Sequence, residues 1–449
     1  LVQIILYSIT IIVTIFTGRV AFRSWKHGLV AGVFLAFPTV NTTLYTTASL
    51  GGYSEAILIG SLGLLLGFWM LDKENLRSFV WMGIWGHLLG LGLWANSLSL
   101  VFFFPMGIAL LVRTFHLNSP KKTSLFILTG VVGLVIGSSP WWIFAIQNGL
   151  GRLIAELGGT AVAVENISLM ERSANHLVNL VILGFPAAIG LRPPWEVRWL
   201  GLPLLPVVLL FWIAVFVYLF RRRKDWDEQR VPYTILSGVI LTLVSLFIFT
   251  PFGVDPSGRY FLPVIFPMAL GAAGLIIHWS VKVWLKIITV LVVISFNLWG
   301  IIDCAVRQPP GITTQFYLPA QVDHQAMPEL IRFLAEQGEI TGYSNYWVAY
   351  PLAFLSDEKI IYTPRLPYHQ DLRYTRRDER YAPYAEIVSS AARTAYITTR
   401  NPVLDQEIKM NFERLGVNCQ EIIIGEYHVY YNLSQSVQPE ELGLGKDQP

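Results

Sequence analysis

The stretch PLLPVVLLFWIAVFVYLFRRRK (203–224) decides the class of this protein. Its first part, residues 203–220, is apolar and uncharged, and four cations follow it directly. An apolar segment of about 20 residues is long enough to cross the hydrocarbon core of a bilayer. Cations that directly flank such a segment mark its cytoplasmic end. The stretch therefore predicts a membrane-spanning helix whose carboxyl end faces the cytoplasm.

Nine more apolar runs make the chain polytopic. Of its 449 residues, 53% are hydrophobic and only 14% are charged, whereas an ordinary soluble domain has about 25% charged residues. The sequence therefore predicts a polytopic α-helical protein of the cell membrane with about ten transmembrane helices. A shorter apolar stretch, 175–190, is interpreted as re-entrant or interfacial because a span there would disturb the charge pattern. The other runs lie near 1–18, 28–47, 53–71, 78–96, 97–113, 123–147, 232–250, 260–279 and 284–303.

The loops between the runs differ in charge. Residues 1–305 hold 20 Lys or Arg and 12 Asp or Glu, a net charge of +8 (20 − 12). If the chain starts outside, 15 of the 20 cations fall in inner loops, as the positive-inside rule requires. Cations placed in this way orient helices, so the basic balance does not indicate nucleic-acid binding. Ten spans return the chain to the outside, and we expect the region after residue 305 to be extracytoplasmic.

The carboxyl-terminal region has the composition of a water-soluble domain. Residues 306–321 form a Pro/Gly-rich linker, residues 322–435 alternate short strands and helices, and residues 436–449 are expected to be a disordered tail. The alternation predicts a small α/β domain, with a terminal hairpin across Gly425-Glu426. Its aromatic side chains could stack on sugar rings or form the domain core, and we favour the core. These side chains are Tyr343, Tyr346, Trp347 and Tyr350.

Chemistry is expected at polar residues near the outer helix ends, because the sequence has neither a nucleotide-binding motif nor a Cys/His cluster. Glu55, in LGGYSEA (50–56), lies where one predicted run ends and the next begins. Its carboxylate could act as a general base or help to hold a divalent metal ion. The alternative is a solvated cap at a helix N-terminus, where the helix dipole stabilises an acid.

A second candidate lies in TPFGVDPSGRYFLP (250–263), which leads into a late span. Arg259 can bond two phosphate oxygens at once, and Tyr260 can add a hydroxyl donor. The alternatives are that Arg259 pairs with Asp255, or that it extends to the headgroups of membrane lipids.

Two weaker candidates complete the set. The segment HLLGLGLWANS (87–97) brings Trp94 and Asn96 to an outer turn, and with Tyr53 and Asp255 they are predicted to line an outer cavity. The long outer loop 148–175 has the pattern of a helix in the membrane interface, which favours a lid or a structural brace.

Together these segments resemble the GT-C glycosyltransferases. The nearest branch is the bacterial family 39 type, similar to dolichyl-phosphate-mannose–protein mannosyltransferases and to aminoarabinose transferases. The segments most like the family are GGYSEA (51–56), GLGLWANSLSL (90–100) and GRYFLP (258–263). The resemblance implies transfer of a sugar from a polyprenyl-phosphate carrier to a glycan, lipid or protein acceptor at the outer face. It also implies that Arg259 and Tyr260 hold the leaving phosphate, with Glu55 near the acceptor or a metal ion.

The chain departs from the family pattern at its start. The family's main acidic motif lies in the first outer loop, directly after the first span, whereas the first complete loop here is cytoplasmic. We therefore expect an N-terminally truncated sequence that is inactive by itself. The alternatives are a transporter or flippase for a lipid-linked saccharide, and a non-catalytic glycan-binding membrane subunit. A transporter would be expected to show inverted repeats, and the sequence shows none.

Overall fold

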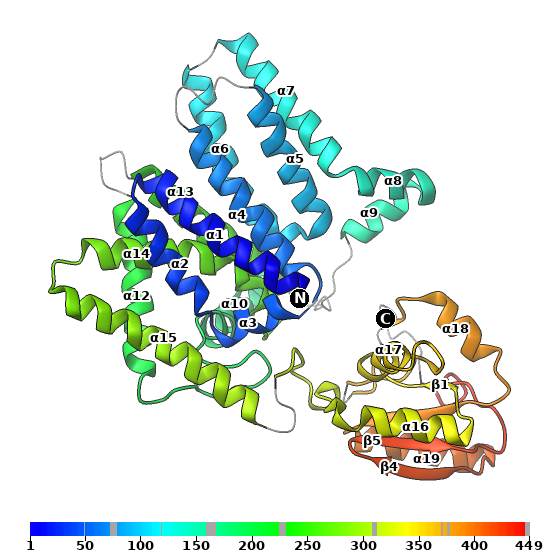
Figure 1. Ribbon diagram of the computed structural model, residues 1–449. Coiled ribbons are helices and arrows are strands. Elements are labelled where there is room, and N and C mark those ends of the chain that lie inside the picture. The colour runs from blue at the N-terminus through cyan, green and yellow to red at the C-terminus, as the bar shows by residue number, and fades with distance from the viewer. Residues whose placement is uncertain are drawn as a thin grey trace. The chain divides into compact units, whose positions relative to one another are not determined.

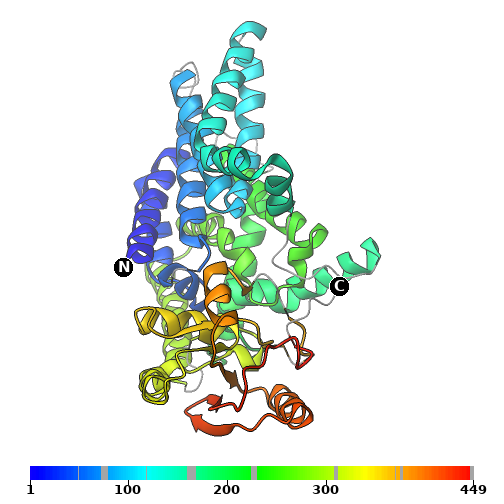
Figure 2. The ribbon, with the colours of Figure 1, turned by 90° about the vertical axis from the view of Figure 1, so that its right-hand side faces the viewer.

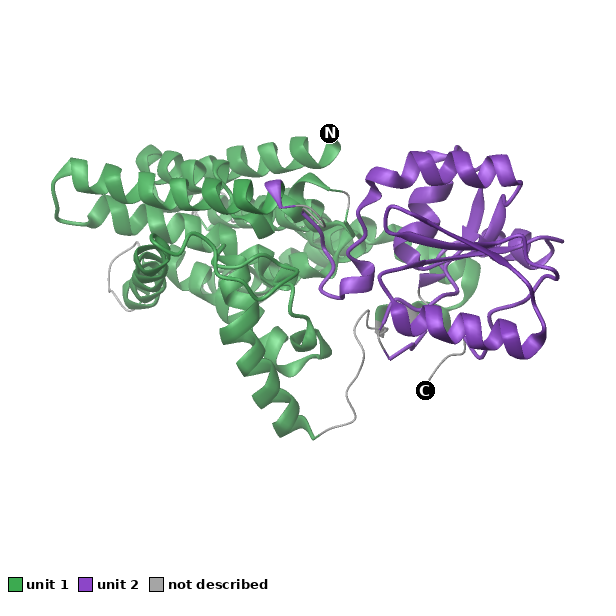
Figure 3. Cartoon of the chain, turned by 90° about the horizontal axis from the view of Figure 1, so that it is seen from below, with its two compact units in different colours: residues 1–305 green, residues 306–449 purple. Residues whose placement is uncertain are grey.

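The computed structural model divides the chain into two compact units, coloured in Figure 3. Unit 1 is Leu1–Ala305 and unit 2 is Val306–Pro449. The structure describes residues 1–48, 50–71, 79–117, 119–158, 168–223, 230–307, 312–369, 371–374 and 378–444.

Unit 1 is a bundle of helices (Figure 1). Within the described residues, eight helical segments are long and apolar enough to cross a membrane, or nine if one bent pair counts as a single span. The polytopic α-helical prediction is therefore confirmed, and the chain is a multi-pass membrane protein. The main helices are α1 (Val2–Phe22), α2 (Trp25–Ala36), α3 (Val40–Thr47), α4 (Tyr53–Met70), α5 (Phe79–Ala95), α6 (Leu100–Leu117), α7 (Pro120–Gly137), α12 (Leu205–Arg222), α13 (Arg230–Phe249), α14 (Ile265–His278) and α15 (Val283–Val306).

The predicted run 28–47 does not form one continuous helix, so the expectation of a single helix there is wrong. Helices α2 and α3 are bent by 81° at the break between them. The break contains Pro38, which has no N–H to donate and disfavours the helical conformation of the residue before it. Thr39 then caps α3 by accepting a hydrogen bond from the backbone N–H of Thr42 at 3.3 Å. The run 123–147 is likewise divided, into α7 and α8 (Ser139–Asn148).

Helices α5 and α7 approach each other through glycine. A Cβ atom on Gly86 would lie 2.0 Å from the carbonyl oxygen of Gly130, and one on Gly137 would lie 2.1 Å from that of His87. Small residues allow such backbone-to-backbone packing inside a membrane, where hydrophobic burial gives no driving force. Helices α5, α6 and α7 lie side by side and project together from unit 1 (Figures 1 and 2).

The stretch 175–190 is not among the candidate spans of the described residues. It begins within α10 (Leu169–Asn179), continues through one π-helical turn (Leu180–Gly184) and ends with α11 (Phe185–Ala188). The predicted interfacial loop contains α9 (Leu150–Gly158) and the start of α10, and its residues 159–167 lie outside the described residues.

Unit 2 is a five-stranded α/β layer with strand order β2-β1-β3-β5-β4. Strands β2, β1 and β3 are parallel, and β4 and β5 form the expected antiparallel hairpin. The elements are α16 (Met327–Gln337), β1 (Thr341–Tyr343), α17 (Tyr346–Leu355), β2 (Ile361–Thr363), α18 (Ala382–Ser389), β3 (Ala395–Thr399), α19 (Pro402–Leu415), β4 (Gln420–Ile424) and β5 (Tyr427–Tyr431).

Residues 436–444 pack against the rest of unit 2, contrary to the expectation of a disordered tail from residue 436. Val437, Leu442 and Leu444 are buried in the same apolar cluster as Tyr396. The Tyr396 hydroxyl also donates to the carbonyl oxygen of Val437 at 2.8 Å. These three apolar side chains are spaced among polar residues and are enough to bury the segment. The average composition of the segment does not reveal them. Residues 445–449 lie outside the described residues.

Candidate functional site

The turn before α14 fixes the position of Arg259. Helix α13 ends at Phe249, and Asp255 then accepts hydrogen bonds from the backbone N–H of Ser257 at 2.8 Å and from its hydroxyl. Gly258 has a φ of 77°, a left-handed conformation that only glycine adopts at little cost. The 3₁₀ turn Arg259–Val264 follows and leads directly into α14.

Arg259 forms an ion pair but keeps hydrogen-bonding capacity. Its Nη2 lies 2.6 Å from Asp255 Oδ2, and the side chains are 30% and 10% exposed, respectively. The Arg259 Nε atom is buried and has no hydrogen-bond partner among the described residues. The predicted pairing of Arg259 with Asp255 is therefore present. Because a guanidinium has five N–H donors, the pairing leaves donors for a ligand.

Aromatic side chains from three elements surround this guanidinium. Its carbon lies 5.0 Å from the ring centroid of Tyr260, and the rings of Tyr45 and Tyr53 meet each other at 5.1 Å. All three tyrosines lie near Arg259. Tyr53 is the first residue of α4, so the structure brings the segment around residue 53 to the segment around residue 259.

Asn41 is a residue of this site that the sequence analysis did not single out. It is fully buried on α3, and its Nδ2 donates to the carbonyl oxygen of Gly258 at 3.3 Å. Its Oδ1 has no hydrogen-bond partner among the described residues. The available signal was an amide in an otherwise apolar run, since polar groups at membrane depth are expensive and often functional.

Glu55 is held by a residue of α1. It lies in the first turn of α4, and its Oε1 accepts a hydrogen bond from Gln3 Nε2 of α1 at 2.9 Å. Its Oε2 is buried and has no hydrogen-bond partner among the described residues. Glu55 therefore lies in the N-terminal turn of α4 and also keeps one carboxylate oxygen without a partner among the described residues.

Asn96 clamps the turn that precedes Glu55. Its Nδ2 donates to Gly51 O at 2.8 Å, and its Oδ1 accepts from the N–H of Leu98 at 2.9 Å. The side chain is therefore occupied in holding backbone. Trp94, from the same sequence segment as Asn96, is 46% exposed on the surface of α5.

Arg192 reinforces the same region from within. It is fully buried, and it donates to the carbonyl oxygens of Leu183 at 3.0 Å, Pro193 at 2.8 Å and Glu196 at 3.0 Å. It also donates to the carbonyl oxygen of Pro256, in the turn that leads to Arg259. From the sequence alone, Arg192 is only one of the five cations (20 − 15) outside the inner loops.

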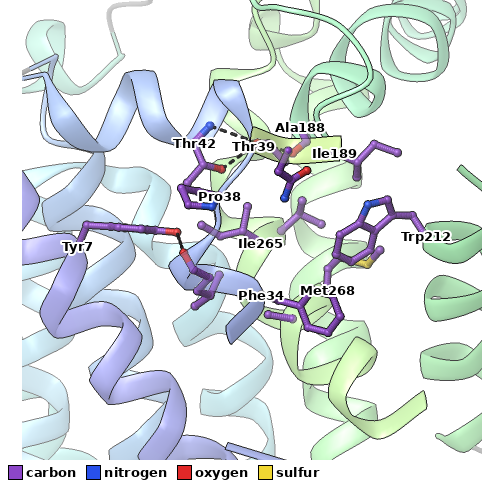
Figure 4. Close-up of a pocket in the computed structure, with 14 residues that line it drawn as sticks. Tyr7, Phe34, Pro38, Thr39, Thr42, Ala188, Ile189, Trp212, Ile265 and Met268 are labelled. Atoms are coloured by element: carbon purple, nitrogen blue, oxygen red, sulfur yellow. Dashed lines mark hydrogen bonds between the residues drawn. The ribbon is translucent and has the colours of Figure 1, made fainter. Parts of the chain in front are cut away.

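A small cavity of about 40 Å³ lies at the break between α2 and α3 (Figure 4). Trp212 and Asn297 line it, and the Trp212 Nε1 and Asn297 Oδ1 atoms have no hydrogen-bond partner among the described residues. The volume suffices for water, which needs about 10–15 Å³. None of the four residues predicted to line an outer cavity lines this one: Tyr53, Trp94, Asn96 and Asp255.

The described residues contain no group of three or more His, Cys, Asp or Glu side chains that could hold a metal ion. The expected use of a divalent metal ion stays a prediction.

No family model and no curated protein sequence matches the chain. Among solved structures, the chain is similar to the crystal structure of ArnT from Cupriavidus metallidurans bound to undecaprenyl phosphate. The match covers 97% of this chain and 85% of that chain, with 13% sequence identity and a TM-score of 0.52. The chain has a GT-C-like fold. At this identity the likeness establishes the fold and assigns no residue.

Within the GT-C-like unit, the predicted site residues do not all lie together: Asn96 holds the backbone at Gly51, and Trp94 is exposed on α5. Tyr53, Asp255 and Tyr260 lie around Arg259, while Glu55 is bound to α1 through Gln3. Arg259 and Glu55 each keep a buried polar atom with no hydrogen-bond partner among the described residues, and the larger group of predicted site residues is centred on Arg259.

Proposed function

We propose that the protein is a membrane glycosyltransferase that moves a sugar from a polyprenyl-phosphate carrier to an acceptor at the extracytoplasmic face. The observation that supports this most is Arg259, a partly exposed guanidinium held by Asp255 and surrounded by tyrosines at the start of a spanning segment. The ArnT structure to which the fold is similar contains undecaprenyl phosphate. A lipid phosphate is the ligand class that such a site would recognise.

The geometry suits a phosphate in three respects. Asp255 fixes the plane of the guanidinium through Nη2, so little side-chain entropy is lost when the remaining donors bind phosphate oxygens. Burial of the pair weakens competition from water and makes each charged hydrogen bond stronger. Tyr260, whose ring contacts the guanidinium, can offer its hydroxyl to a third oxygen.

The transfer itself would be a single displacement. The acceptor oxygen bonds to the anomeric carbon of the sugar, the bond between that carbon and the phosphate oxygen breaks, and the lipid phosphate leaves with the bonding electrons. Glu55 is proposed to take the acceptor proton on Oε2, because Oε1 already accepts from Gln3. Unchanged transfer in Glu55→Gln would remove this assignment.

A transporter of lipid-linked saccharides is the second candidate, and one observation favours it. Transporters often contain broken helices that meet at a polar site within the membrane. The 81° break between α2 and α3, beside the unpaired polar atoms of Trp212 and Asn297, is a feature of that kind. Movement of labelled lipid across a vesicle membrane, without sugar transfer, would select this candidate.

The first test is thermal unfolding of the purified chain in detergent, with and without a polyprenyl phosphate. A ligand at 100 times its dissociation constant stabilises the folded state by about 2.7 kcal/mol. We compare the wild type with Arg259→Ala and with Arg152→Ala, which removes an exposed arginine from α9.

The proposal predicts a ligand-induced rise in unfolding temperature for the wild type and for Arg152→Ala, and its loss in Arg259→Ala. Equal rises in all three proteins would show that the lipid binds elsewhere. No rise in a folded wild type would contradict carrier binding.

A further inference from the structure

Unit 2 contains a continuous series of aromatic rings, most of which lie outside its two apolar cores. Tyr346 meets Trp347 at 4.7 Å and Tyr350 at 5.2 Å between ring centroids. Trp347 meets Tyr368 at 6.2 Å, and Tyr368 meets His369 at 4.3 Å. We call these five residues the aromatic strip.

Most of the strip is neither core nor fully exposed. Tyr343 is buried in an apolar cluster, as expected, and Tyr350 packs against the edge of that cluster. Tyr346, Trp347 and Tyr368 belong to no apolar cluster, and each is half-buried. The expectation that Tyr346 and Trp347 form the domain core is therefore wrong. Helix α17 turns smaller residues inward: Val348, Ala349, Leu352 and Ala353.

The strip lies at the carboxyl edge of the parallel strands. Strand β1 ends at Tyr343, three residues before Tyr346, and β2 ends at Thr363, five residues before Tyr368. In open α/β sheets, ligands bind outside the carboxyl ends of the strands, where the strand order reverses. The order β2-β1-β3 reverses direction at β1, from which α17 departs.

Hydrogen-bonding groups accompany the rings. The Arg380 guanidinium carbon lies 5.3 Å from the centroid of the Tyr346 ring, and Arg380 is exposed. The Trp347 Nε1 atom has no hydrogen-bond partner among the described residues. Burial lowers the pKa of His369 to about 4, so this ring is neutral at pH 7. Apolar ring faces bordered by donors match a pyranose, which has C–H faces and a hydroxyl rim, better than they match an acyl chain.

We propose that the aromatic strip binds a glycan chain, with sugar rings stacked on Tyr346, Trp347 and Tyr368. The glycan's role as acceptor rests on the proposed function, whereas its binding does not.

The test uses the whole chain in lipid nanodiscs. Isothermal titration with cellohexaose, maltohexaose and a mannose hexasaccharide measures binding by the wild type and by Trp347→Ala, Tyr346→Ala and Tyr346→Phe. Phe354→Ala is the matched control, because Phe354 is on the same helix, 79% exposed and outside the strip. Hydrogen exchange over β1 and β3 checks that unit 2 stays folded in each variant.

The inference predicts saturable binding of at least one hexasaccharide, weakened roughly tenfold or more in both alanine variants. Tyr346→Phe and Phe354→Ala retain it, because they preserve the stacking rings. Binding that is equal in all variants, or no binding into the millimolar range by folded wild type, overturns the inference.

Hydroxyl-radical footprinting adds a site-resolved measurement. Protection of Tyr346 and Trp347 by the hexasaccharide supports the inference, whereas protection by the bilayer alone, relative to detergent, would assign the strip to the membrane surface and overturn it. No sugar donor is present in either experiment. A chain that binds glycan but fails to bind polyprenyl phosphate would therefore refute the proposed function and leave this inference standing.

Discussion

Two arginines on neighbouring turns of unit 1 have opposite surroundings. Arg192 is fully buried and directs its donors at four backbone carbonyl oxygens. Arg259 is 30% exposed, pairs with the carboxylate of Asp255 and keeps a buried Nε with no partner among the described residues. The first guanidinium is saturated by the fold, whereas the second still has donors to offer.

The two are also connected. Arg192 donates to the carbonyl oxygen of Pro256, three residues before Arg259. Arg192, whose donors bind backbone, thus holds the turn that carries Arg259, whose donors are not all bound. A structural arginine thus differs from a binding arginine in how many of its N–H donors already have partners. The charge of the residue in the sequence does not reveal that number.

Loss of Arg192 should have the largest effect on stability. Arg192→Ala takes the guanidinium donor from four carbonyl groups in one buried and three partly buried hydrogen bonds, and a buried acceptor left without a donor costs about 1–3 kcal/mol. We expect destabilisation by about 3 kcal/mol or more, measured as the denaturant midpoint or unfolding temperature in detergent. Arg152→Ala, on exposed α9, should change neither. An unfolding temperature of Arg192→Ala equal to that of the wild type would contradict the structural role assigned to Arg192.

Gly52→Ala should weaken the turn that positions Tyr53. Gly52 has a φ of 80°, and an added Cβ would lie 2.9 Å from the carbonyl oxygen of Ala95. The left-handed conformation and the close contact together should cost about 2 kcal/mol. Gly51→Ala, with a φ of 74° and only Tyr53 within 4 Å among the described residues, is the matched control and should cost less. Equal unfolding temperatures for the two variants would contradict the role of the Ala95 contact.

Arg259→Lys should leave stability nearly unchanged and weaken polyprenyl-phosphate binding about tenfold, or about 1.4 kcal/mol. Lysine keeps the charge but cannot bond two phosphate oxygens with a planar fork. Titration of the lipid into the purified variant gives the dissociation constant. A lysine variant that binds as tightly as the wild type would show that Arg259 contributes charge alone.

The smallest effect concerns a third buried charge, in unit 2. Burial raises the pKa of Asp378 to about 6, and Arg380 opposes this only in part. Because the folded pKa exceeds that of the unfolded chain, near 4, Asp378 should lower the stability of unit 2 as pH rises from about 4 to 6. The change in unfolding free energy over this pH range should be about 1 kcal/mol smaller in Asp378→Asn than in the wild type, after allowance for the partial exposure of Asp378.

Hydrogen exchange of peptides from β3 between pH 4 and 7 measures this difference. His369 has the opposite slope, since burial lowers its pKa to about 4, but its contribution cancels between wild type and variant. Identical pH profiles of the two proteins would contradict the effect assigned to Asp378.

The sequence predicted the class of fold because long apolar runs and flanking cations have few interpretations. It did not predict the break at Pro38 within a run that looked continuous, because hydropathy ignores backbone donors. Nor did it predict the ordered segment that ends at Leu444, because three spaced apolar residues hardly change a local average.

For the site, residue chemistry singled out Arg259, Tyr260 and Asp255, which do lie together. Asn41 and Arg192 were missed because each binds a backbone carbonyl group of the turn before α14 that is more than 60 residues away, at Gly258 and Pro256, respectively. Contacts of this kind leave no periodic or local signal in a sequence.

The most direct test of the central claim is photo-crosslinking with a polyprenyl phosphate that has a diazirine next to the phosphate, followed by mass-spectrometric mapping of the labelled peptide. We predict label on residues 250–264 or on the peptide that contains Asn41 and Tyr53, reduced by excess unlabelled lipid and by Arg259→Ala. Label confined to the cationic end of α12, around Arg221–Arg223, and unchanged in Arg259→Ala would contradict a carrier-phosphate site at Arg259.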